Sequence, residues 1–284
     1  MVLMSSKLGI IYSVNDLAGS GIAEVLAGRF KCREVKVERA VNALSYSSNR
    51  FDVVLAGFKE ETFNFEFLDD VVDVDFYIIL SKHRSEAGIK SFTVHSTGNP
   101  WREADVGGKP LELSVANPQA AKTLLLNLFK FRGEWGLDGF DVTYEVTHHG
   151  PTSPIKPLTF IEIGSCEHEW SLREAREVVA ESVLDLVENG LLSSYLPVVG
   201  FGGNHYASRF SERALKTEEA YGHMIAKYVI DKLTVNDLNQ VVMNAITKNA
   251  QKILRVVVEK KLKSLYRKTI RDIASQLNIN YLET

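Results

Sequence analysis

Cysteine is nearly absent from the 284-residue chain, which contains only Cys32 and Cys166. Two cysteines are too few for a disulfide framework, and their separation excludes the C-x-x-C spacing of zinc and redox motifs. Long hydrophobic runs are also missing, since no stretch approaches the roughly 18 apolar residues of a membrane-spanning helix. The first residues lack the basic, apolar and small-residue blocks of a signal peptide. We therefore expect a cytoplasmic protein outside membranes, with both cysteines as structural thiols.

Three motifs of nucleotide-binding and hydrolytic enzymes are absent as well. Gly19-Ser20-Gly21 follows the first expected strand, but Glu24 stands where G-x-G-x-x-G requires its third glycine. Neither the phosphate-binding motif G-x-x-x-x-G-K-[ST] nor the G-x-S-x-G turn of α/β-hydrolases occurs. These absences argue against a dinucleotide-dependent enzyme, a P-loop NTPase and a serine hydrolase of the α/β-hydrolase type.

Charge is unevenly distributed, although the formal net charge is only −3. Residues 248–271 contain nine Lys and Arg and a single acid, Glu259, so this segment has a net charge of +8 and the remainder −11. Such segregation suggests contact with a polyanion. The solvated face of an amphipathic helix would give the same pattern, and the sequence leaves both interpretations open.

Short apolar runs rich in Val, Ile and Phe alternate with helical stretches, which favours an α/β fold. We expect strands at 8–14, 51–58, 75–81, 91–95, 141–146, 158–163 and 198–201. We expect helices at 117–131, at 171–187 and from about 211 to 233. In the second of these, Ser171 and Glu174 have the spacing of a capping box.

The last fifty residues are expected to be all helix, beginning near Thr234, which has capping-box spacing to Asp237. The apolar positions of this segment would pack on the body and leave its Lys and Arg outside. The glycine-containing loop 98–113 is either a lobe boundary or a substrate lid. We expect residues 1–284 to form one domain, with room for two packed lobes, ending in a basic helical segment from about 234.

Five of the seven histidines lie at or just beyond the carboxyl ends of expected strands. They are His83, His95, His148, His149 and His205. Ligands of open α/β sheets bind at this end of the strands, so these side chains are expected to share one pocket. Glu162 belongs with them, because a carboxylate between two isoleucines of a strand is costly to bury unless it is paired, protonated or bound to a metal.

Imidazoles and a carboxylate support hydrolysis in two ways. They can bind Zn²⁺ with an open position for water, or act without metal as general base and acid. The spacing matches no known zinc motif such as H-E-x-x-H, so both alternatives remain open. Glycines beside the histidines, Gly150 and Gly203 among them, can bring backbone N–H groups close to an oxyanion.

Four segments resemble the signature blocks of the D-aminoacyl-tRNA deacylases of archaea and plants. They are SKHRSEAGIKSFTVHSTGNP, HHGPTSP, FIEIGSCEHEW and GFGGNHYASRF, and they cover roughly residues 80–210. Two positions depart from the family pattern, with Asn204 before His205 and Ser208 where the family has proline. The resemblance implies a three-layer α/β/α fold with a mixed, mostly parallel sheet, related to phosphorylases and peptidyl-tRNA hydrolase. It also implies Zn²⁺ as cofactor and a role in translation quality control.

The resemblance implies a role for each matching residue. Catalytic roles fall on His149, Glu162, His205 and Thr152, metal binding on His83, His95 and His148, and substrate contacts on Gly150, Gly203 and Tyr206. The substrate would be D-aminoacyl-tRNA, whose ester water attacks while the L-form is spared. The acceptor arm of the tRNA would lie on Lys252, Arg255, Lys260, Lys263 and Arg267, and the protein would act as a monomer.

Two other functions fit parts of the sequence. One is a phosphorylase or nucleosidase acting on a nucleoside, which leaves the basic segment unexplained. The other is an RNA- or DNA-binding regulator without enzymatic activity, in which the histidines hold a structural zinc.

Overall fold

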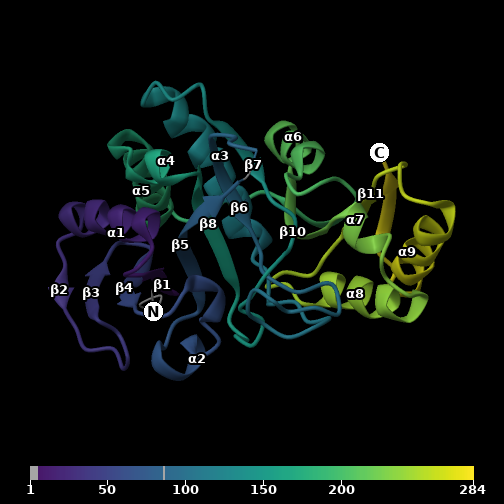
Figure 1. Cartoon of the computed structure of the whole chain (residues 1–284), viewed down its shortest axis with the longest axis horizontal. Coiled ribbons are helices and arrows are strands. Elements are labelled where there is room, and N and C mark those ends of the chain that lie inside the picture. Colours follow the sequence, from purple (N-terminus) through teal and green to yellow (C-terminus); the bar gives the residue numbers. More distant parts are fainter. Residues whose placement is uncertain (1–5, 86) are drawn as a thin grey trace.

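The computed structural model describes residues 6–85 and 87–284, and it contains a large and a small β-sheet (Figure 1). The large sheet has eight strands in the order β2-β3-β4-β1-β5-β8-β6-β7. These are β1 (Ser6–Ser13), β2 (Arg33–Glu34), β3 (Asn42–Ser47), β4 (Phe51–Phe58), β5 (Phe76–Arg84), β6 (Ser91–His95), β7 (Asp141–Tyr144) and β8 (Leu158–Ser165). The neighbours β4, β1, β5 and β8 are parallel, whereas β6 is antiparallel to β8 and β3 to β4.

Both faces of the large sheet are covered, because alternate residues of its strands point to opposite sides. Leu8 and Ile10 pack with the helices α1 (Leu17–Arg29), α3 (Pro118–Glu134) and α5 (Arg173–Asn189). Ile11 lies in a second cluster on the other face, with Phe65 and with Leu68 of the short helix α2 (Leu68–Val71). The three-layer α/β arrangement with a mixed, mostly parallel sheet is therefore confirmed.

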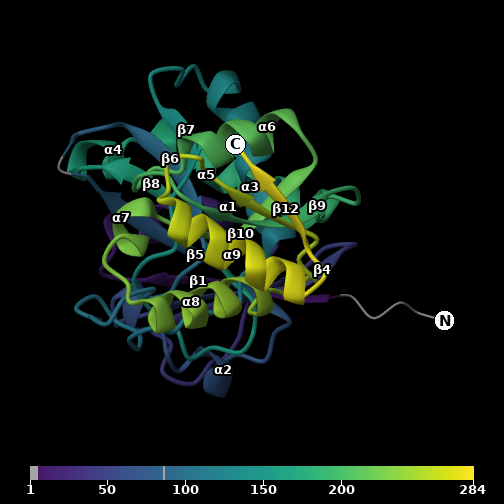
Figure 2. The same ribbon diagram turned by 90° about the vertical axis from the view of Figure 1, so that its right-hand side faces the viewer.

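The small sheet is entirely parallel, in the order β10-β9-β11-β12. Its strands are β9 (Leu196–Phe201), β10 (Glu219–Ile225), β11 (Arg255–Val258) and β12 (Asn280–Glu283). The accompanying helices are α6 (Ser208–Lys216), α7 (Lys227–Ile230), α8 (Val235–Thr247) and α9 (Ser264–Gln276), whereas the short α4 (Glu167–Ser171) follows β8 of the large sheet. Figure 2 faces α8 and α9, which lie side by side on this part of the molecule. One hydrophobic cluster includes residues of both sheets, so the two share a core.

The seven expected strands are confirmed, and the bounds of β4 and β6 agree with 51–58 and 91–95 to the residue. The helix predicted at 117–131 is α3, whose first turn is capped by the Asn117 side chain. The helix predicted at 171–187 is α5, but Ser171 belongs to α4 and the expected capping box is not formed. Both described cysteines have free thiols, and that of Cys166 is exposed.

The prediction that the last fifty residues are all helix is wrong. Only α8 and α9 are helical there, and β11 and β12 are strands of the small sheet. Val256, Val257 and Val258 are consecutive, buried and β-branched, and such a run fits a strand covered on both faces better than one stripe of a helix. The predicted cap of α8 is confirmed, since Thr234 Oγ1 accepts the Asp237 N–H at 3.2 Å.

The prediction of a helix from about 211 to 233 is also wrong. The segment contains α6, strand β10 and the short α7 in turn. Every residue of β10 is buried, including His223, whose ring contacts Thr147 Oγ1 at 3.1 Å and the carbonyl of Ser114 at 3.1 Å. His223 thus lies in a strand, in contact only with structural partners. Among residues 6–85 and 87–284, every helix is too short or too polar to cross a membrane.

Candidate active site

The predicted histidines and acids gather at one place, although they come from five separate segments. His83 lies near the end of β5, His95 ends β6, and Glu162 lies in β8. The pair His148 and His149 follows β7, and His205 follows β9. The carboxyl end of β7 from the large sheet and that of β9 from the small sheet therefore meet here.

The backbone after β7 joins the two sheets. Val146 N–H donates to the carbonyl of His205 at 3.0 Å, and Thr147 N–H donates to that of Met224 at 2.7 Å. On the other side, Thr97 forms a parallel bridge with His148. This segment therefore places the histidine pair between the sheets.

Glu145 occupies the centre of the cluster and was not among the predicted site residues. Its side chain is completely buried, with Oε2 2.9 Å from His205 Nε2 and 3.5 Å from His148 Nε2. Its Oε1 lies 3.0 Å from His83 Nδ1. Neither oxygen has a hydrogen bond of normal geometry among the described residues. A buried carboxylate in this condition requires a cation beside it, either a protonated imidazole or a metal ion.

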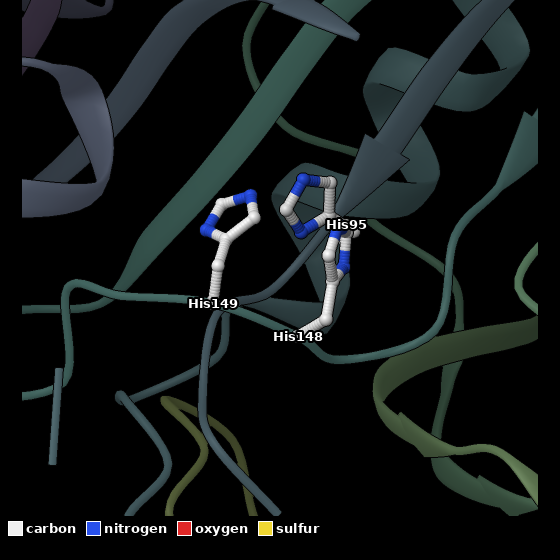
Figure 3. A group of neighbouring side chains, drawn as sticks. All are labelled: His95, His148 and His149. Carbon is white, nitrogen blue, oxygen red and sulfur yellow. The ribbon is translucent and has the colours of Figure 1, made fainter. Parts of the chain in front are cut away.

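Three imidazoles are oriented by the backbone. Nδ1 of His95, His148 and His149 lies 3.2, 2.8 and 2.6 Å from the carbonyls of Ser96, Val146 and Gly150, respectively. Because a carbonyl only accepts, each Nδ1 carries a proton, and the Nε2 atoms of neutral His148 and His149 keep their lone pairs. Figure 3 shows the three rings gathered at the end of β6. One ligand atom from each lies within 4.8 Å of those of the others, as in a metal site.

A second set of possible ligands adjoins the first, and it consists of His83, Glu145 and His205. The predicted metal ligands His83, His95 and His148 are thus divided between two neighbouring sets. Tyr206 contacts this second set, since its hydroxyl lies 3.0 Å from His83 Nε2.

Glu162 is buried below the histidines rather than at the surface of the site. Its Oε2 lies 3.7 Å from both His95 Nε2 and His83 Nδ1. Thr93 Oγ1 is 3.4 Å away from the same oxygen. Glu162 therefore acts on a substrate only through these imidazoles.

The surroundings determine the charge of each group. Burial and the nearby charge of His95 lower the pKa of His149 to about 3, and burial with the neighbouring imidazoles holds the pKa of His148 well below its usual range. Burial alone would lower the pKa of His95, but Glu162 outweighs it and raises that pKa. Burial would raise the pKa of Glu145, yet the adjacent His205 and His83 hold it well below its usual value. Glu145 is thus ionised and His149 neutral at ordinary pH.

A cavity of about 560 Å³ opens above the cluster. His148, His149 and His205 lie along one side of it, and Trp101 and Tyr228 also line it. The remaining lining residues are Asn99, Arg102, Glu103, Asp105, Val106, Val229, Lys232, Leu233, Thr234 and Asp237. They come from the loop after β6 and from the segment that joins α7 to α8.

An ion pair fastens the loop after β6 to α8 beside this cavity. Arg102 pairs with Asp237 of α8 through contacts of 2.8 and 2.9 Å. Within the loop, Asn99 Nδ2 donates to the carbonyl of Gly107 at 2.7 Å. Of the two interpretations of 98–113, the lining of the cavity by this loop agrees with a substrate lid.

The histidine pair lies in a constrained turn. His149 has a φ of 43°, a left-handed conformation that side chains other than glycine rarely adopt, and such strain occurs often at functional sites. A Cβ on Gly150 would lie 2.5 Å from Phe63 O and from Gly108 N, so only glycine fits there. The expectation that Gly150 donates to an oxyanion needs correction, because its N–H already donates to Val106 O at 2.9 Å.

Thr152 forms hydrogen bonds that stabilise the same turn. Its Oγ1 accepts the Lys109 N–H at 2.9 Å, and its own N–H donates to the Glu66 carboxylate at 2.9 Å. Ser153 N–H also donates to Glu66, at 2.6 Å. The side chain of Thr152 is buried and does not line the cavity. The structure therefore gives Thr152 and Glu66 a positioning role, and Glu66 was missed in the sequence.

Gly203 remains available as a backbone donor. It has a φ of 74°, which favours glycine, and its carbonyl accepts the Lys227 N–H at 3.0 Å. This contact places Gly203 at the start of α7, two residues before His205.

The five predicted tRNA-binding residues are separated by the structure. Arg255 lies opposite Val198 at the start of β9, and its guanidinium is 2.9 Å from Glu219. Arg267 is similarly committed to Glu283 at 2.6 Å. Their charges are therefore largely neutralised within the protein.

Lys260 and Lys263 follow the opposite end of β11, where Val258 pairs with Phe201 next to the glycines of the site. Lys260 is exposed, and Lys263 lies 3.4 Å from Asp231, the neighbour of the cavity residue Lys232. Lys252 is exposed but precedes the far end of the strand.

Comparison with known proteins agrees with this geometry. Residues 71–282 match the sequence model of a family described as D-aminoacyl-tRNA deacylase. A protein of that name from Desulfurococcus amylolyticus is 39% identical to this chain, in a match that covers 97% of this chain and 100% of that protein. Another from Staphylothermus marinus is 41% identical, in a match that covers 89% of this chain and 90% of that protein. The crystal structure of a conserved protein of unknown function is also similar, with a TM-score of 0.85 and 34% identity over 99% of this chain and 95% of that one.

Proposed function

The chain belongs to the D-aminoacyl-tRNA deacylase family, and we propose that its buried cluster hydrolyses the ester between a D-amino acid and the 3′ end of tRNA. The products are the free D-amino acid and the tRNA. The convergence of imidazoles around the buried Glu145, at the floor of a cavity, is the observation that carries this proposal. The family match favours it over a nucleoside phosphorylase and over a regulator without enzymatic activity.

Zinc fits this donor set. The carboxylate oxygens of Glu145 are buried and have no hydrogen bond of normal geometry among residues 6–85 and 87–284, and imidazole and carboxylate are ordinary zinc ligands. We assign Zn²⁺ to His83, Glu145 and His205, because this set supplies the carboxylate that needs a cation. When bound, the ion would polarise the ester carbonyl and increase the acidity of water.

The side chains that remain can move the protons. The Nε2 lone pair of His149 accepts a proton from the attacking water, and its lowered pKa keeps this nitrogen unprotonated while also making it a weaker base. The water oxygen bonds to the carbonyl carbon, and the bond from that carbon to the ribose oxygen breaks. The ribose oxygen then takes up the proton from His149. Gly203 N–H is the backbone donor for the oxyanion, in place of Gly150.

The stereochemical test compares D- and L-tyrosyl-tRNA with the same enzyme. We expect kcat/KM for the D-ester to exceed that for the L-ester by a factor on the order of 10² or more, because exchange of hydrogen and side chain at Cα places the side chain against a cavity wall.

Dialysis against a chelator should lower activity by about 10² or more, and added Zn²⁺ should restore it. Equal rates for the two enantiomers would contradict the proposal, and full activity after chelation would contradict the zinc assignment alone.

The tRNA would approach over the basic residues next to the cavity. Lys232 lines the cavity, and Lys260 and Lys263 lie at the nearby end of β11. Lysines bind RNA phosphates through charge, with little reading of sequence. We further propose that the protein acts as a monomer in the cytoplasm, where its tRNA substrate is found.

Replacement of Lys260 and Lys263 by alanine should therefore weaken tRNA binding. We expect KM to rise about tenfold and the slope of log KM against log salt to decrease by roughly 1.5, because each lost phosphate contact removes about 0.7 to 0.9 from that slope. The control is the double variant Lys31→Ala and Lys36→Ala, which removes the same charge from exposed positions near β2, across the molecule in Figure 1. An equal effect of the two double variants would refute a local phosphate path.

A further inference from the structure

The cavity is larger and more aromatic than an amino acid requires. Its volume of about 560 Å³ lies within the range of roughly 300–1,000 Å³ that holds a complete small-molecule ligand. The histidines account for one side of it. Trp101 from the loop after β6 and Tyr228 from α7 contribute aromatic rings to the same cavity, with Val106 and Leu233 beside them.

Tyr228 is unusually exposed for a side chain of this kind. It is 40% exposed, and Val106 of the same cavity is 46% exposed. Apolar surface that collects in a concave site indicates a ligand with a matching flat or apolar part. The ester that would react at the histidines is polar and does not match this apolar surface. Another part of the substrate, flat or apolar, would therefore lie against it.

Tyr228 lines the same cavity as His148, His149 and His205, so its ring borders the space in which the ester would react. In an aminoacyl-tRNA, the ester and the terminal base are attached to the same ribose. When the ester carbonyl is at the histidines, the base must consequently lie one sugar ring away, within this cavity.

We propose that Tyr228 and Trp101 form the binding site for the terminal adenine of the tRNA, an inference that rests on the proposed function. Base stacking on an aromatic ring needs only a flat apolar surface, which both side chains supply. Lys232 lines the same cavity and offers positive charge to the phosphate of the terminal nucleotide. The ion pair between Arg102 and Asp237 ties the loop that carries Trp101 to α8, the helix that follows α7 along the chain.

The test uses two small esters that differ only in the base. One is 3′-O-D-alanyl adenosine, and the other is the same D-alanyl ester of 1-O-methyl ribose. The wild-type enzyme should prefer the adenosine ester by about 10- to 100-fold in kcat/KM, the usual worth of one stacked base. Tyr228→Ala should reduce this ratio to near one, and Tyr228→Phe should preserve it because the ring remains.

Phe129→Ala is the matched control, since Phe129 is an aromatic residue of α3 with 48% exposure that does not line the cavity. It should leave the ratio unchanged. If Tyr228→Ala fails to fold, Tyr228→Leu keeps the apolar volume without a flat ring and should show the same loss of preference. An unaltered ratio in the correctly folded Tyr228 variant overturns the adenine site.

Three further outcomes distinguish failure of this inference from failure of the proposed function. Wild-type cleavage of both esters at equal rates overturns the adenine site and leaves the deacylase function standing. Tyr228→Ala could instead lower kcat/KM more for D-tyrosyl than for D-alanyl esters, whether or not the base is present. The ring would then contact the amino acid, and the proposal would be wrong. Failure to cleave any D-aminoacyl ester, tRNA included, overturns the proposed function and this inference with it.

Discussion

Glu145→Gln is expected to remove bound zinc and to lower kcat by about 10³ or more. The substitution keeps the size of the side chain but removes the negative charge that lies between His83 and His205 in the proposed ligand set. Loss of metal assistance worth several kcal/mol corresponds to this factor at 1.36 kcal/mol for each tenfold change in rate. Zinc content of the purified variant and its single-turnover rate on D-tyrosyl-tRNA are the two measurements.

Glu219→Gln is the matched control for this experiment. Glu219 is also a buried carboxylate in a strand, but it pairs with Arg213 at 2.6 Å and with Arg255 at 2.9 Å, at the end of β10 remote from the histidines. It should lower the melting temperature without changing the zinc content. If Glu145→Gln retains a full complement of zinc, the assignment of His83, Glu145 and His205 as the ligand set is wrong.

Replacement of His149 should also lower kcat, but it should leave the zinc content of the protein unchanged. We expect kcat to fall by about 10² to 10⁴, the usual contribution of a general base. His149→Asn is the better variant, because asparagine tolerates the left-handed backbone at φ 43° whereas alanine adds strain there. Zinc analysis and rates between pH 5 and 9 would be compared with those of the wild type.

His168→Asn serves as its control, since this histidine has 72% exposure and contacts only Glu169 in the described structure. It should behave as wild type. Burial and the charge of His95 lower the pKa of His149 to about 3, so His149 stays neutral from pH 5 to 9 and its replacement should lower the rate by the same factor at every pH in this range. Wild-type activity of His149→Asn would remove His149 from the mechanism.

The positions of the strands and of the histidines could be predicted because each rests on a local pattern. A run of alternating or continuous apolar residues defined β4 and β6, and the ends of such runs located His83, His95 and His149. Glu145 carried the same signal as Glu162, a carboxylate flanked by buried apolar residues in a strand, and was detectable by that criterion.

Other features depend on contacts between distant segments. The valines of β11 are buried on both faces only because β9 and β12 lie on either side, and a short apolar run does not by itself distinguish strand from helix. The N–H of Gly150 is unavailable because Val106, forty-four positions earlier, accepts it. The ion pair of Arg255 likewise requires Glu219 to lie on a neighbouring part of the small sheet.

The backbone from Glu145 to His148 has a further consequence, because it is hydrogen-bonded to segments of both sheets. The ligands and the base are divided between these sheets, so neither one alone contains a working centre. The shared hydrophobic core and the hydrogen bond from Val146 to His205 keep the two sheets aligned. Turnover should therefore be lost on heating in the same transition that melts this core.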